Sequence, residues 1–332
     1  MERAQFAAFA DSSSGEWEGV IATFDADGGK PQPLPERFVP NAFAEWGVVV
    51  ADWQAQTSML ASAEEGTLQY RVRRMMPTVG CEADAVAWEE ESQVLWAGSS
   101  GRPVLPDGSY MAGPSCLSPD DTKASVEVCL ALPNVATGAG AGKRSRVRVV
   151  THLTRHGETK VWRAARYEVS TERYDTEYRG GGQDLQLLGC HGTRTISDGA
   201  VTSEGDAEAA GSGGAAGWRV AGGHVYDLGV GGGAGSSGVP RTLAPGESPP
   251  PGLRGWGDTT RLPEGLFGRV TVPAGSTEEL QIEIGAVVVA VGSGEPPREP
   301  ARRRVARVMY TAAGLATFLV TDEQAPAPAP AA

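Results

Sequence analysis

The sequence lacks the long apolar runs and the paired cysteines that mark membrane-spanning and disulfide-bonded proteins. No run of about 18 apolar residues occurs, so we expect no transmembrane helix. The four cysteines, at positions 81, 116, 129 and 190, form no Cys-x-x-Cys pair. This spacing predicts reduced thiols rather than a disulfide framework or a metal site. The N-terminus resembles neither a secretory signal nor a transit peptide, which indicates a cytosolic protein or a targeting segment absent from this chain.

Basic residues are too few for a nucleic-acid-binding protein. The chain has 41 acidic and 29 basic residues and a formal net charge of −12, so general attraction to nucleic-acid phosphate is not expected. Arginine gathers at residues 143–148 and 302–304. We interpret both runs as solvated strand faces, and an anion-binding or acidic-partner patch is the alternative.

Amphipathic helices of 12 or more residues are also absent, and short segments typical of strands recur instead. Alternating or β-branched residues separated by turn residues predict strands at 20–24, 46–53, 68–76, 146–154, 160–169, 185–196, 280–284, 286–291, 305–310 and 315–321. Strands 146–154 and 160–169 form one expected hairpin, and 305–310 and 315–321 form another. The pattern predicts an all-β protein built as antiparallel barrels or a sandwich.

Composition divides the chain into two predicted barrels. Residues 1–196 form the first, residues 197–217 are a linker of Gly, Ala, Ser and acidic residues, and residues 218–322 form the second. A Gly/Pro-rich insertion at 230–256 is expected to be mobile, and residues 323–332 are an Ala/Pro tail. Strands ending in Phe24-Asp25 and Tyr226-Asp227 give the two parts a similar plan.

Motifs in the N-terminal part resemble the DUF3598 family. They are Gly-Glu-Trp-Glu-Gly from Gly15, Leu-Pro-Glu-Arg-Phe-Val-Pro from Leu34, Glu-Trp-Gly from Glu45, Asp-Trp-Gln from Asp52 and Pro-Thr-Val-Gly-Cys-Glu-Ala-Asp from Pro77. The resemblance implies two tandem barrels of the lipocalin or calycin type, related in fold to phycobiliprotein chromophore lyases of the CpcS and CpeS type. Because such proteins occur in cyanobacteria and plastids, it also implies a chloroplast location, in the stroma or peripheral to the thylakoid, and a bound tetrapyrrole or lipid.

The same resemblance suggests a role for Trp17. In calycin barrels a tryptophan on the first strand commonly closes the base of the barrel against an arginine from the last strand, and Trp17 matches that position. Stacking of a guanidinium on indole contributes about 1 kcal/mol. An ordinary core tryptophan is the alternative.

A candidate ligand site follows from alternation in residues 68–76. Tyr70 and Val72 share an apolar face that we expect to point into the barrel, whereas Arg71 and Arg73 face outward. Trp46 and Trp53 are an odd number of residues apart, so one of the two is expected to reach the interior. These residues predict an apolar pocket in the first barrel.

Arg74 interrupts this inward face and needs an anionic partner. A ligand carboxylate, Glu82 or Asp84 could supply it. Because Glu82 and Asp84 are two apart on an expected strand, they could also share a face for acid–base chemistry or pair with other arginines. The sequence identifies no catalytic residue.

Three other motifs are weak. Residues 137–144 lack the first Gly and the final Ser or Thr of a phosphate-binding loop. His152 and His156 have the spacing of a helical zinc pair but lie in an expected strand and its turn, about 13 Å apart. Cys190 and His191 would point to opposite faces of a strand.

Three functions remain open. The leading hypothesis is a protein that binds a small apolar or amphipathic ligand, a tetrapyrrole or a lipid. The first alternative is a lyase-like enzyme that attaches a chromophore. The second is an assembly factor with filled barrels that acts on a protein partner. An eight-stranded barrel can be filled or hold a ligand, so the interior volume distinguishes these cases.

Overall fold

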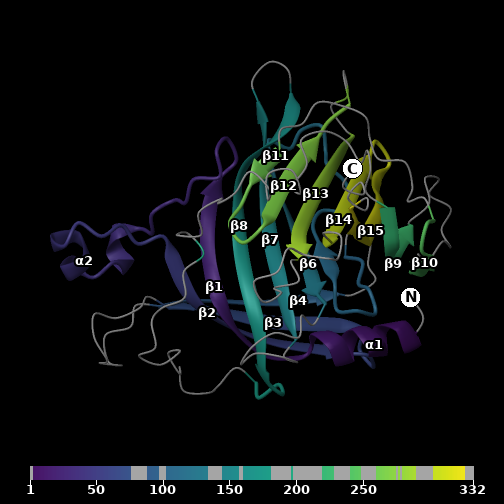
Figure 1. Ribbon diagram of the computed structural model, residues 1–332, viewed down its shortest axis with the longest axis horizontal. Helices are drawn as coiled ribbons and strands as arrows, with labels where there is room; N and C mark the ends of the chain where they lie inside the picture. Colours follow the sequence, from purple (N-terminus) through teal and green to yellow (C-terminus); the bar gives the residue numbers. More distant parts are fainter. Residues whose placement is uncertain are drawn as a thin grey trace, which may run out of the picture.

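The computed structural model describes residues 3–75, 88–96, 102–133, 144–156, 160–180, 196, 219–227, 240–247, 259–273, 276, 279–288 and 302–325. Its regular structure there is almost entirely β, in two antiparallel sheets, one of eight and one of seven strands (Figure 1). The all-β prediction is confirmed. The helical elements in these ranges are α1 (Arg3–Ser13), η1 (Glu36–Phe38) and α2 (Asn41–Glu45). None of the described helices is long and apolar enough to cross a membrane.

The first sheet has the strand order β4-β3-β2-β1-β8-β7-β6-β5. Its members are β1 (Gly15–Asp25), β2 (Asp52–Ser62), β3 (Thr67–Met75), β4 (Trp88–Trp96), β5 (Tyr110–Ala112), β6 (Lys123–Leu132), β7 (Ser145–His156) and β8 (Val161–Thr176). The first strand pairs with the last, which leaves β4 and β5 at the two edges of the sheet. Residues of β3 and of β6, β7 and β8 line one pocket, so the sheet is curled. The β7–β8 hairpin appears where alternation and turn residues predict it, with longer strands.

The second sheet repeats this plan with the order β10-β9-β15-β14-β13-β12-β11. Its members are β9 (Arg219–Asp227), β10 (Arg241–Leu243), β11 (Thr259–Arg261), β12 (Leu266–Thr271), β13 (Leu280–Val288), β14 (Arg302–Thr311) and β15 (Gly314–Gln324). Its first strand, β9, again pairs with its last, β15. The similar plan seen in the sequence is present here, because β1 ends at Asp25 and β9 at Asp227.

The two sheets pack face to face around one core (Figure 1). β14 lies against β6 and β12 against β8. Val126 and Val149 of the first sheet belong to the same buried cluster as Ile284 and Phe318 of the second. Polar contacts cross the junction too, since the Tyr310 hydroxyl donates to the Pro114 carbonyl at 3.0 Å.

The middle parts of strands β1, β6, β7 and β8 are therefore buried on both faces. On β1, Val20 faces the shared core, while its neighbour Ile21 belongs to a second cluster with α1 and β2. In these strands the second sheet covers the face that points away from the pocket, so that face does not meet water.

The predicted strand at 46–53 is wrong. Helix α2 ends at Glu45, a turn follows in which Gly47 has φ +69°, and β2 begins only at Asp52. Val48 and Val49 are exposed. Three consecutive valines favour a strand locally, but none of the described strands pairs with residues 48–50.

The predicted break at Gly285 is also wrong, because residues 280–288 form the single strand β13. A Cβ atom at Gly285 would lie 2.1 Å from a ring carbon of Phe267. Glycine at this position therefore permits close packing rather than ending the strand.

The predicted boundaries of the two barrels and of the linker stay predictions. Strand β10 lies inside the segment 230–256, and β15 runs to Gln324, two residues beyond the predicted end of the second barrel. The linker 197–217 lies outside the described residues, as does the predicted strand 185–196 except for Ile196.

Candidate functional site

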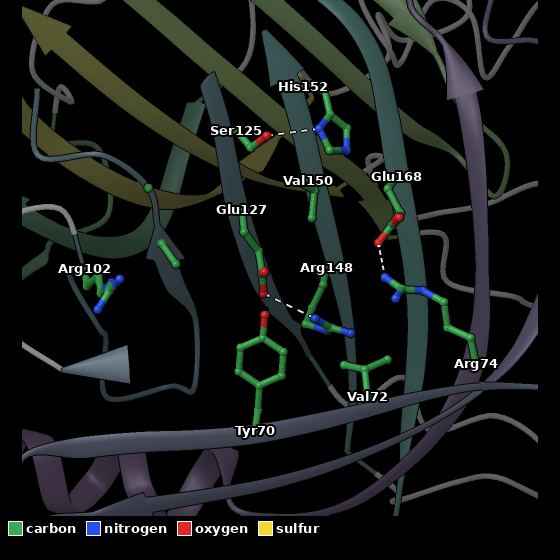
Figure 2. Close-up of a pocket in the computed structure, with 12 residues that line it drawn as sticks. Tyr70, Val72, Arg74, Arg102, Ser125, Glu127, Arg148, Val150, His152 and Glu168 are labelled. Atoms are coloured by element: carbon green, nitrogen blue, oxygen red, sulfur yellow. Dashed lines mark hydrogen bonds and ion pairs between the residues drawn. The ribbon is translucent and has the colours of Figure 1, made fainter. Parts of the chain in front are cut away.

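A pocket of about 370 Å³ lies inside the curl of the first sheet (Figure 2). Strand β3 forms its floor and strands β6, β7 and β8 form a wall across from it. The lining combines a few apolar and aromatic side chains with a larger set of polar and charged side chains. It includes Tyr70, Val72, Arg74, Arg102, Ser125, Glu127, Arg148, Val150, His152 and Glu168.

Strand alternation explains this mixed lining. On β7, Arg148, Val150 and His152 are two residues apart and point into the pocket, while the intervening Val149 packs into the shared core. Register places Glu127 opposite Val150 across β6 and β7. The charged face of β7 therefore points inward, and its apolar face meets the second sheet.

A buried ion cluster holds Arg148 in the wall of the pocket. Glu172 accepts from Arg146 Nε at 2.6 Å and from Arg148 Nε at 2.9 Å. The hydroxyls of Thr57 and Ser170 donate to the same carboxylate at 2.9 and 3.0 Å. Burial raises the pKa of Glu172, but Arg146 and Arg148 outweigh burial and lower it to about 2. Glu172 is therefore an ionised anchor that fixes two arginines.

Glu127 and Arg148 form an ion pair at the inner end of the pocket. Arg148 Nη1 lies 3.3 Å from Glu127 Oε1. The Tyr110 hydroxyl donates to the same oxygen at 2.5 Å, and burial together with Glu127 raises the pKa of Tyr110 well above its ordinary value. The Tyr70 side chain points toward this group (Figure 2).

At the outer end, Arg74 pairs with Glu168. Arg74 Nη2 lies 2.8 Å from Glu168 Oε1, and these side chains are 15% and 28% exposed. Alternation places Arg74 on the inward face, where it needs an anionic partner. In the structure that partner is Glu168 on β8. Glu82 and Asp84, the protein partners expected from the sequence, lie outside the described residues.

His152 and Ser125 form a further polar pair at this end, with 3.0 Å between His152 Nδ1 and Ser125 Oγ. Burial, followed by the nearby Arg166, lowers the pKa of His152. The imidazole is therefore neutral at pH 7 and adds no charge to the pocket.

Arg102 differs from the other pocket arginines. Among the described residues it has no hydrogen-bond or ion-pair partner, and it is half-buried on the side of the pocket opposite Arg74 (Figure 2). Three arginines and two glutamates line the pocket, so its formal charge is +1. Since Arg74 and Arg148 are paired, this charge resides on Arg102. Sequence reasoning missed Arg102, which follows no alternating strand and belongs to no motif.

The structure separates the two tryptophans from the pocket. Tyr70, Val72 and Arg74 line it together, but Trp53 is buried against Phe38 with 4.9 Å between ring centroids. Trp46 is 61% exposed on the outer surface. The pocket wall is consequently more polar than the predicted apolar lining.

Trp17 is buried on β1 beneath an arginine. The Arg146 guanidinium lies 3.8 Å from the centre of the Trp17 ring system, and the Trp17 indole donates to the Ser13 carbonyl at 3.1 Å. The resemblance implies an arginine from the last strand, but Arg146 belongs to β7, the neighbour of that strand. The last strand contributes Tyr174, whose ring meets Trp17 edge-on at 5.5 Å.

The interpretation of both arginine runs as solvated faces is wrong. Arg146 and Arg148 are buried with Glu172, and Arg303 is buried with Glu323 Oε2 2.7 Å from its Nη2. In each sheet an arginine on the strand before the last therefore pairs with a glutamate on the last. The two sheets share this arrangement as well as their strand order.

The remaining sequence motifs add no site. His152 and His156 both lie on strand β7, and no group of three potential metal ligands occurs among the described residues. Cys116 and Cys129 are free thiols. Residues 137–143, Cys190 and His191 lie outside the described part of the chain.

The antiparallel curl of the first sheet, the pairing of its first and last strands and its interior pocket make it a β-barrel that is open between β4 and β5. No family model and no curated protein matches the chain. Among solved structures, it is similar to a DUF3598 protein of unknown function from Nostoc punctiforme PCC 73102, with 14% identity over 98% of this chain and 100% of that one, at a TM-score of 0.48. That is the family whose motifs the N-terminal part resembles.

A second solved structure is the S-type phycobiliprotein lyase CpeS from Guillardia theta. It is 12% identical, and the match covers 52% of this chain and 94% of that one at a TM-score of 0.29. Neither similarity assigns an activity to this chain.

Proposed function

We propose that the protein binds a small amphipathic ligand with an anionic group in the pocket of the first sheet. The observation that carries this proposal is Arg102, an arginine with no described partner in a pocket whose other arginines are paired. A carboxylate or phosphate matches the fork of donors on a guanidinium and forms strong charge-assisted hydrogen bonds with it.

The pocket supports binding over the alternative of filled barrels. Its volume of about 370 Å³ lies at the lower end of the range of small-molecule sites. Tyr70, Val72 and Val150 offer apolar surface to the body of a ligand, and Arg102 offers a charge to its head. This combination favours an amphipathic ligand over a purely apolar one.

Tetrapyrroles with propionate groups and fatty acids both join a carboxylate to an apolar frame. We include both classes in the proposal. The sequence motifs resemble a family of cyanobacteria and plastids, so the proposal also places the protein in a photosynthetic plastid. Binding requires no catalytic residue.

The change Arg102→Ala is expected to weaken binding by about 10- to 150-fold. The reason is that a hydrogen bond to a charged group contributes about 1.5–3 kcal/mol, and every 1.4 kcal/mol changes Kd tenfold. Isothermal titration calorimetry with a bilin and with a fatty acid measures the loss. Arg163→Ala is the matched control, because Arg163 is exposed on β8 and is not part of the pocket lining.

Equal affinities of the wild type and Arg102→Ala would contradict the role of Arg102. Failure of both ligand classes to bind the wild type would contradict the proposed function itself. Thermal unfolding of each variant, monitored by circular dichroism, verifies that a lost affinity reflects the pocket rather than the fold.

A further inference from the structure

The exposed large apolar side chains of the described residues gather on one projection. Residues 36–50, which we call the α2 projection, carry Trp46, Val48 and Val49, with exposures of 61%, 46% and 74%. Figure 1 shows α2 standing away from both sheets at one edge of the molecule. A grouped apolar patch of this kind marks an interaction site more often than a scattered exposed side chain does.

The α2 projection is held in a defined shape. The Phe38 ring packs on buried Trp53 at its base, with 4.9 Å between centroids. The Val48 amide donates to the Phe43 carbonyl at 2.9 Å, and Gly47 with φ +69° makes the turn between Trp46 and Val48. These contacts fix the apolar side chains on the outside of the projection.

The shape and size of the apolar patch on the α2 projection favour a lipid surface over a protein partner. One tryptophan and two valines offer roughly 400 Å² of apolar surface. A stable protein complex buries about 800 Å² on each partner. A bilayer accepts a projecting tip without a groove of matching shape, and tryptophan is enriched at the membrane interface.

The net charge of the α2 projection indicates which lipids it can bind. The α2 projection contains Glu36, Arg37 and Glu45, a formal charge of −1, and the whole chain has −12. An anionic membrane surface repels such a protein, whereas an uncharged or zwitterionic one does not.

We propose that the α2 projection inserts Trp46, Val48 and Val49 into the interface of an uncharged or zwitterionic lipid bilayer. The protein then docks reversibly on the membrane surface through this tip. This docking function does not depend on the pocket of the first sheet.

Flotation with phosphatidylcholine vesicles tests the proposal. The wild type floats with the vesicles, and the double variant Trp46→Ser, Val49→Ser loses at least tenfold in partition coefficient, because two apolar side chains no longer leave water. Glu45→Gln is the matched control, since it changes an exposed residue of the same projection without removing apolar surface, and its partition coefficient stays within about twofold of the wild type. Vesicles containing half phosphatidylserine bind the wild type more weakly.

Several results would overturn this proposal. One is a wild type that does not float, and another is a double variant that floats as well as the wild type. A third is self-association seen by sedimentation velocity, lost in the double variant and without vesicle binding, which would assign the tip to a second copy of the chain. Because both replaced side chains are exposed, unchanged thermal unfolding is expected for the double variant.

Discussion

The change Glu172→Gln is expected to lower the free energy of unfolding by about 3–5 kcal/mol, the usual cost of removing one partner of a buried ion pair. Glu172 is the shared partner of Arg146 and Arg148, both of which are buried. Without its charge, both guanidinium groups remain inside the sheet with too little compensation. Urea unfolding of the wild type and the variant at pH 7 measures the difference.

The pH dependence of stability gives the same prediction a second readout. The folded pKa of Glu172 is about 2, against an ordinary value of 4.5, so its contribution is present above pH 4.5 and is lost as the pH falls toward 2. This difference corresponds to roughly 3 kcal/mol. Glu172→Gln should lack that part of the acid dependence.

Glu64→Gln is the control for this experiment, because Glu64 is an exposed carboxylate in the turn between β2 and β3. It should change stability by less than about 0.5 kcal/mol. A loss of stability in Glu172→Gln no larger than that of the control would show that the buried cluster is not held by this carboxylate.

The change Phe318→Ala is expected to destabilise both sheets together by about 3–5 kcal/mol. Phe318 lies on β15 and is fully buried in the core that the second sheet shares with the first. Its loss leaves a cavity between the sheets. Because the core is continuous, we expect one cooperative unfolding transition rather than separate transitions of two barrels.

Tryptophan fluorescence can report on the N-terminal part of the chain, which contains the first sheet. In a background of Trp218→Phe and Trp256→Phe, the six remaining tryptophans lie between residues 17 and 162. Phe318→Ala should then lower the unfolding midpoint seen by these tryptophans, although the replaced residue is in the other sheet. An unchanged fluorescence midpoint, with a lowered midpoint by far-ultraviolet circular dichroism, would mean that the two sheets unfold independently.

Local patterns in the sequence predict the strands well but not the direction of their faces. Alternation on β3 correctly groups Tyr70, Val72 and Arg74 on one side. The same alternation on β7 cannot reveal that Arg148 faces the pocket and Val149 the second sheet. The direction depends on packing between segments more than 100 residues apart, for which the local pattern contains no signal.

Trp46 and Arg102 show two further limits. β-Branched residues 48–50 favour a strand, but a strand forms only where another strand can pair with it. Arg102 differs from the other pocket arginines because those are paired with carboxylates. Arg74, for example, donates a hydrogen bond to Glu168, which is 94 positions away in the chain. The sequence contains all these arginines and gives no indication of which one is left for a ligand.

Native mass spectrometry of the protein isolated from its own cells tests whether the pocket of the first sheet binds an anionic amphipathic ligand. We expect one small molecule for each chain, with a carboxylate or phosphate on an apolar frame. We also expect that the Arg102→Ala variant, isolated from the same cells, has largely lost that molecule. A wild-type protein that carries no ligand, or a variant that retains the same ligand at the same occupancy, would contradict the proposed binding site.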